Sequence, residues 1–164
     1  LSGCMVRGID GDCGIHDASA VAEAIRHQDV HHPRTRMVAI ENSHNRGGGS
    51  VWTLDGFEAV AGVGRERGLH VHVDGARLFN ACVAGGYTLA EFARSADTIN
   101  VCFSKGLGAP IGSVLCADAA HIERARHFRK MYGGGWRQAG ILAAAAHPDR
   151  GALEENNAGQ ELPT

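Results

Sequence analysis

The chain has 164 residues, of which 44% are hydrophobic and 23 are glycine, and its formal net charge is −2. This composition is typical of a globular domain that is long enough to bury a core, and it excludes an intrinsically disordered chain. The near-neutral charge gives no basic field that would favour nucleic acid or an anionic membrane, and no apolar run approaches the roughly 20 residues that span a bilayer.

Apolar runs that are typical of buried strands alternate along the chain with helical patterns. In chain order we predict a helix over 17–26, a strand over 37–40, a helix over 53–67, a strand over 69–73, a helix over 88–94, strands over 98–103 and 111–116, and helices over 118–130 and 136–146. The last two strands are close enough in sequence to pair as a hairpin-like step. The alternation predicts an α/β fold, with a mostly parallel sheet and flanking helices.

The sequence predicts one domain over residues 1–146, because the composition turns polar from His147 onward. We expect 147–164 to be a poorly ordered polar tail. The first residues show no basic segment followed by an apolar stretch, so we expect no signal peptide. The five cysteines are scattered without a C-x-x-C pair, which is typical of reduced thiols in a cytoplasmic protein, and we expect Cys82, Cys102 and Cys116 to be small core residues.

Charged side chains and glycines directly follow two of the predicted strands. Asp74 and Gly75 follow the strand over 69–73, and Lys105 and Gly106 follow the strand over 98–103. Ligands of parallel sheets gather at the carboxyl ends of the strands. A lysine amine at such an end can attack a carbonyl group, and an aspartate on the neighbouring strand can pair with a cationic ring nitrogen. Pyridoxal 5′-phosphate (PLP) requires this pair of groups.

Each of these residues also has a simpler interpretation. A strand-end lysine before glycine is commonly a solvated loop residue, and Asp-Gly is commonly just a turn. His70 and His72 alternate along one strand and share a face at a spacing that would suit a metal. No third ligand accompanies them in the sequence, so we expect no metal site.

Four segments, in the same order, resemble those of the low-specificity L-threonine aldolases. They are 41–45 (ENSHN), 72–81 (HVDGARLFNA), 103–113 (FSKGLGAPIGS) and 129–138 (RKMYGGGWRQ). Two of the four contain Asp74 and Lys105. The resemblance runs from about residue 1 to residue 146, and four ordered segments make it specific.

The resemblance implies part of the large domain of a fold-type-I, aminotransferase-like PLP enzyme. Such a carbon–carbon lyase would cleave L-threonine or L-allo-threonine to glycine and acetaldehyde. Lys105 matches the lysine that holds PLP as a Schiff base, and Asp74 matches the partner of the pyridine nitrogen. Arg77 matches an arginine near the cofactor and the substrate carboxylate, which its planar guanidinium suits.

Three further residues match family positions around the substrate. His31 aligns with a histidine near the substrate hydroxyl, so we expect a catalytic role on the hydroxyl proton. Lys130 and Arg137 match basic residues near the site, and we expect them to bind substrate. The resemblance also implies a homodimer or homotetramer that acts on a small amino acid and binds neither nucleic acid nor membrane.

The resemblance also implies parts of a site that these residues do not include. In the family, a phosphate-binding turn and a histidine stacked on the cofactor ring lie upstream of the position that matches Leu1. A small C-terminal domain with a further arginine lies downstream of the matching region. The alternative interpretation is a catalytically inactive truncated fragment, or an interaction module derived from such an enzyme. For the isolated chain we expect little or no aldolase activity.

Overall fold

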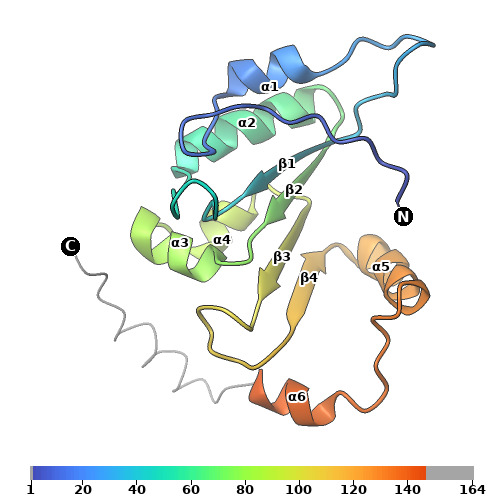
Figure 1. Ribbon diagram of the computed structural model, residues 1–164. Coiled ribbons are helices and arrows are strands. Elements are labelled where there is room, and N and C mark those ends of the chain that lie inside the picture. Colours follow the sequence, from blue (N-terminus) through green and yellow to red (C-terminus); the bar gives the residue numbers. More distant parts are fainter. Residues whose placement is uncertain (1, 147–164) are drawn as a thin grey trace.

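The computed structural model describes residues 2–146, which form a sheet with helices packed around it (Figure 1). The sheet of this part of the chain has the order β1 (Met37–Glu41), β2 (His70–Asp74), β3 (Thr98–Cys102) and β4 (Ser113–Ala117). The first three strands are parallel, and β4 runs antiparallel to β3. The predicted α/β fold with a mostly parallel sheet is confirmed, and so is the pairing of the last two strands.

The helices between and after these strands are α1 (Ala18–Ala24), α2 (Leu54–Glu66), α3 (Leu78–Gly85), α4 (Leu89–Ala93), α5 (Ala119–Met131) and α6 (Gly140–Ala145). Helix α3 was not predicted from the sequence, because it has no side-chain cap at its start and therefore no start signal. The last predicted helix is shorter than expected, since α6 begins at Gly140 and not at Trp136.

Side-chain caps explain where several of the predicted helices begin. The Thr53 side chain accepts a hydrogen bond from the Gly56 backbone N–H at the start of α2, as the sequence predicts. Asp118 accepts from the His121 backbone N–H in the same way at the start of α5. At the other end of α2, Gly68 has a φ of 63°, a conformation that glycine adopts without steric cost and that ends the helix.

One face of the sheet packs against α2, which in turn packs against α1, and the core forms on this side (Figure 1). Val71 and Val73 are buried on this face of β2, whereas the residues between them point to the other face. The core continues outward through Phe57 of α2, whose ring stacks on that of Phe92 at a centroid distance of 4.2 Å. A period of two in β2 therefore divides an apolar face from a polar one.

The edge strand β4 is much less covered than the other strands. None of the five residues of β4 is buried, and Val114 and Leu115 are 38% and 37% exposed. The prediction that three cysteines lie in the core is wrong for Cys116, which is exposed on β4; Cys82 is half-buried and packs against the core, and Cys102 is half-buried. The predicted tail over 147–164 lies outside the described residues. Within those residues, no helix has the length and apolar character needed to cross a membrane.

Candidate functional site

Asp74 is the last residue of β2 and lies at the carboxyl end of the parallel strands. Its side chain is exposed, and its Oδ1 accepts hydrogen bonds from Asn100 Nδ2 at 3.1 Å and from the Ala76 backbone N–H at 3.2 Å. One carboxylate oxygen is thus held by the protein, and the other can accept from a ligand.

Gly75 lets the chain turn closely past the neighbouring strand. Its backbone N–H donates to the Asn100 carbonyl oxygen at 2.8 Å. A Cβ at this position would lie 2.8 Å from that same oxygen and 3.0 Å from the Cβ of Leu78, so any larger residue would displace the backbone. The Asp-Gly pair is therefore part of the strand-end structure and more than a generic turn.

Lys105 lies in the loop between β3 and β4, and its side chain is exposed. The loop is held by its own backbone: Gly108 N–H donates to the Lys105 carbonyl oxygen at 2.9 Å, and Ala109 N–H donates to the Phe103 carbonyl oxygen at 3.0 Å. Gly106 lies so close to the side-chain amide of Asn80 in α3 that a Cβ there would clash with it. These contacts hold the Lys105 loop against the helix that follows Asp74.

Arg77 is half-buried and immediately precedes α3, three residues after Asp74. Lys130 lies in the last turn of α5, and Arg137 lies in the segment between α5 and α6; both are exposed. Figure 1 shows this segment returning to the end of the sheet where the β3–β4 loop lies.

The structure places His31 elsewhere. It lies, exposed, in the long loop between α1 and β1, and its backbone N–H donates to Asp29 Oδ1 at 2.8 Å. This loop precedes β1 and therefore meets the amino ends of the parallel strands, at the opposite end of the sheet from Asp74 (Figure 1). Within this chain, His31 is not brought to the candidate site.

Two residues beside Asp74 were not predicted as site residues. Asn100 is paired with Asp74 in the β2–β3 register, and His72 is paired with Thr98. Burial lowers the pKa of His72, against the opposing effects of an Asn100 hydrogen bond and the Asp74 charge. The period of two in both strands could have placed these side chains on one face with Asp74. No group of His, Cys, Asp or Glu in residues 2–146 is arranged to hold a metal ion.

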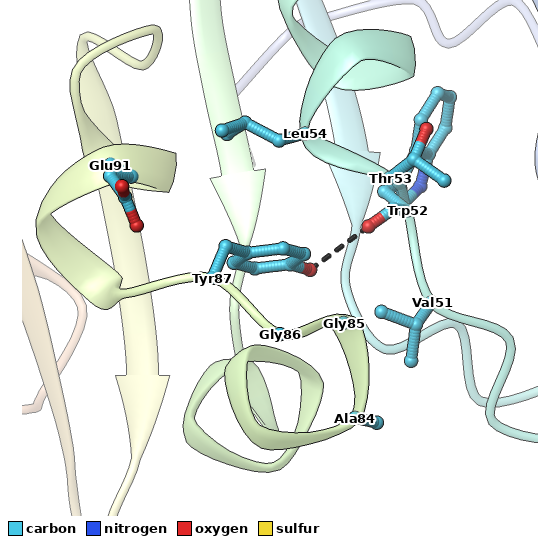
Figure 2. A pocket seen from close by; sticks show the side chains of 9 residues that line it. All are labelled: Val51, Trp52, Thr53, Leu54, Ala84, Gly85, Gly86, Tyr87 and Glu91. Atoms are coloured by element: carbon cyan, nitrogen blue, oxygen red, sulfur yellow. Dashed lines mark hydrogen bonds between the residues drawn. The ribbon is translucent and has the colours of Figure 1, made fainter.

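A surface pocket of about 460 Å³ lies away from these residues (Figure 2). It is lined by residues 51–54 at the start of α2, by residues 84–87 after α3, and by Glu91. Figure 2 shows the Tyr87 hydroxyl directed at the Trp52 carbonyl oxygen, to which it donates at 3.0 Å. Neither Asp74 nor Lys105 lines this pocket, so it is not the candidate site.

The two side chains at the strand ends, Asp74 and Lys105, fit the chemistry of PLP. An exposed carboxylate oxygen of Asp74 can accept a hydrogen bond from a cationic ring nitrogen, and the exposed amine of Lys105 can attach to an aldehyde. Both groups follow strands that are direct neighbours, β2 and β3, and they leave the sheet at the same edge. The two reactive ends of one cofactor ring could therefore be bound at this edge.

The sequence model of the family described as "Beta-eliminating lyase" matches residues 1–159. Low-specificity L-threonine aldolase 1 of Arabidopsis thaliana is 42% identical over 145 residues, which cover 87% of this chain and 40% of that protein. The low specificity L-threonine aldolase of Escherichia coli (strain K12) is 47% identical over 125 residues, which cover 76% of this chain and 37% of that protein. The chain thus spans about two fifths of the length of these relatives.

Solved structures show the same fold. A threonine aldolase from Leishmania major superposes with a TM-score of 0.76 at 22% identity, over 90% of this chain and 44% of that one. A PLP-bound C–S lyase from Staphylococcus hominis has a TM-score of 0.56 at 13% identity, over 92% of this chain and 39% of that one. At such identities the likeness shows the fold alone, which is that of fold-type-I PLP enzymes.

Proposed function

This chain belongs to the beta-eliminating lyase family, and from that premise we propose that it carries the lysine-bearing part of a PLP-dependent aldolase site. The reaction is the cleavage of the Cα–Cβ bond of L-threonine or L-allo-threonine to glycine and acetaldehyde. The observation that carries the proposal is the position of Asp74 and Lys105 after two neighbouring strands of one sheet. The names of the relatives at 42% and 47% identity support the same reaction.

Each residue has a distinct task in this proposal. The Lys105 amine attaches to the cofactor aldehyde, and the Asp74 carboxylate stabilises positive charge on the ring nitrogen. When bound, PLP withdraws electrons from the bond that breaks. Arg77 offers a planar pair of N–H donors to a carboxylate, and Lys130 and Arg137 add positive charge for an anionic substrate.

Two finer expectations remain part of the proposal. The protein associates into homodimers or homotetramers, and it works in the cytoplasm. His31 is left out of the assigned site, because its loop precedes β1 and lies at the other end of the strands. A role for His31 would require a contribution from a second chain.

Trapping the cofactor tests the proposal directly, because the chain contains two lysines, Lys105 and Lys130. Both are exposed, so they form a matched pair for a reaction with an aldehyde. The purified chain is incubated with PLP and reduced with borohydride, and the modified lysine is identified by peptide mass spectrometry. We expect the modification on Lys105.

Two variants serve as controls in this experiment. Lys105→Ala should abolish the adduct together with its visible absorbance, and Lys130→Ala should retain both. An adduct that persists in Lys105→Ala, or one that is divided evenly between the two lysines, would contradict the proposal. Addition of L-threonine to the unreduced wild-type chain with bound PLP should change the visible spectrum, with little or no acetaldehyde formed.

A further inference from the structure

A row of polar side chains leads along the sheet to Asp74. His72 and Asp74 lie on the same face of β2, and Thr98 and Asn100 lie beside them on the same face of β3. This is the face opposite the core, because Val71 and Val73 are buried on the other side. Asp74 therefore ends a polar row that neither the proposed function nor the family match explains.

Hydrogen bonds join the members of this row. Asn100 Nδ2 donates to Asp74 Oδ1 at 3.1 Å, and the Asn100 side chain acts on the His72 ring as a polar neighbour that raises its pKa. Nδ1 of His72 lies 2.7 Å from the Thr98 hydroxyl oxygen, and Nε2 of His70 lies 3.1 Å from that same oxygen. Thr98 is buried, with 8% of its surface exposed, which shields the middle of the row from water.

One set of donors satisfies these groups together. The Asn100 amide nitrogen faces the Asp74 carboxylate, which can only accept, so the amide oxygen remains to accept from His72. With Nδ1 of His72 at the Thr98 hydroxyl, a ring that carries its proton on Nε2 accepts the hydroxyl proton at Nδ1. Thr98 can then accept from His70.

A neutral His72 ring is needed for this pattern, and its surroundings favour one. Burial lowers the pKa of His72, and the nearby charge of His70 acts in the same direction. The Asp74 charge and the hydrogen bonds to Asn100 and Thr98 oppose this effect without reversing it. On β1, the residue paired with His72 is Ala39, which carries no charge.

We propose that Asn100 and His72 are positioning residues for the Asp74 carboxylate. Asn100 holds Oδ1 and leaves Oδ2 available for the ring nitrogen of the cofactor, and His72, as a donor to the Asn100 amide oxygen, supports the orientation in which the amide nitrogen faces Asp74. Without the His72 donor, the amide oxygen loses this partner and the amide is held by Asp74 alone. The part of this inference that concerns the cofactor rests on the proposed function.

The hydrogen-bond pattern can be tested without any cofactor. Nitrogen-15 NMR of the full chain labelled at histidine should show a neutral His72 ring at pH 7 with its proton on Nε2. In His72→Leu, the Asn100 side-chain amide protons should exchange faster with water than in wild type, and in His72→Gln, which restores a side-chain donor, they should be protected again. A His72 ring protonated on Nδ1, or charged at pH 7, would overturn the inference.

Binding of PLP tests the consequence for Asp74. We expect Asn100→Leu and His72→Leu to raise the Kd for PLP by about tenfold, the effect of weakening one charge-assisted hydrogen bond, and His72→Gln to stay within about threefold of wild type. His121→Leu, which removes a ring contact to His70 outside the row, is the control and should bind as wild type does.

The outcomes separate the two proposals. Circular dichroism of every variant checks that the fold is retained. Equal PLP affinity in wild type, Asn100→Leu and His72→Leu would overturn the positioning role while the adduct on Lys105 still stands. A wild-type chain that forms no reducible adduct would instead contradict the proposed function, and the histidine spectrum would still decide whether the row holds Asp74 as described.

Discussion

At the scale of single residues, Tyr87 connects three segments that are distant in sequence. Its hydroxyl accepts from Asn42 Nδ2 at 2.9 Å and donates to the Trp52 carbonyl oxygen at 3.0 Å. All three residues are buried, and burial raises the pKa of the Tyr87 hydroxyl, which keeps it protonated as a donor. Because Asn42 directly follows β1, this network fixes the chain next to the strand end that neighbours Asp74.

Removing only the Tyr87 hydroxyl should lower the stability of the protein. We expect Tyr87→Phe to lower the free energy of unfolding by about 1–3 kcal/mol, because the buried Asn42 amide and Trp52 carbonyl would each lose a partner. Urea denaturation followed by circular dichroism measures the change. Tyr132→Phe is the matched control, since Tyr132 is 51% exposed, and it should differ little from wild type. An equal effect of the two substitutions would contradict this role for Tyr87.

Some site residues could be predicted from the sequence, and others could not. Asp74 and Lys105 were predicted at neighbouring strand ends because each directly follows an apolar run, and the structure places them there. The role of Asn100 was not predictable in the same way. It depends on the β2–β3 register, which pairs Asn100 with Asp74 across 26 positions of sequence.

At the scale of elements, helix starts were predictable because their signals are local. Thr88 and Glu91 form a reciprocal capping box at α4, in which each side chain bonds the other residue's backbone N–H. Thr53 and Asp118 cap their helices in the expected manner. The missed α3 shows the limit, because it follows Gly75 without a capping side chain and is held by packing of Leu78 and Ala81 in the core.

Acidic caps should make stability depend on pH. Hydrogen bonds from the His121 backbone N–H and side chain hold the pKa of Asp118 below its usual range. A carboxyl whose pKa is lowered on folding stabilises the protein above its unfolded pKa of about 4, and this contribution is lost as the pH falls through the folded value. The same holds for Asp17 and Glu91, whose pKa values are also lowered by hydrogen bonds at helix starts.

Asp118→Asn tests this dependence. At pH 6 we expect the variant to be nearly as stable as wild type, because asparagine caps a helix as well as aspartate does. Between pH 5 and pH 3 the wild type should lose more stability than the variant, which has no carboxyl to protonate at this position. Thermal unfolding at each pH measures the difference, and parallel curves for the two proteins would contradict the prediction.

At the scale of the whole molecule, the packing of α2 on the sheet depends on a residue without a side chain. A Cβ at Gly64 would lie 3.0 Å from Cγ2 of Val71, which is 1% exposed and surrounded by the core. Gly62 lies in the same helix, and a Cβ there would have no neighbour within 4 Å. A larger residue at position 64 would therefore press on the core, whereas a larger residue at position 62 would meet no neighbouring atom.

Alanine at each position should show this difference. We expect Gly62→Ala to raise the free energy of unfolding by about 0.5–1 kcal/mol through reduced backbone entropy in the unfolded chain. Gly64→Ala should lower it, since overpacking a core typically costs about 1–3 kcal/mol and outweighs that gain. Chemical denaturation of both variants is the measurement. A stabilising Gly64→Ala would mean that Val71 can move away.

The sequence by itself determined the alternation of strands and helices, most helix starts, and the two residues at the strand ends, because these follow from local periodicity, caps and short motifs. Only the tertiary structure decided how those elements meet. It put His31 at the opposite end of the strands from Asp74, left the cysteine of β4 exposed, and paired Asn100 with Asp74. These features depend on strand register and on which face another element covers, and both are set by contacts between segments far apart in the chain.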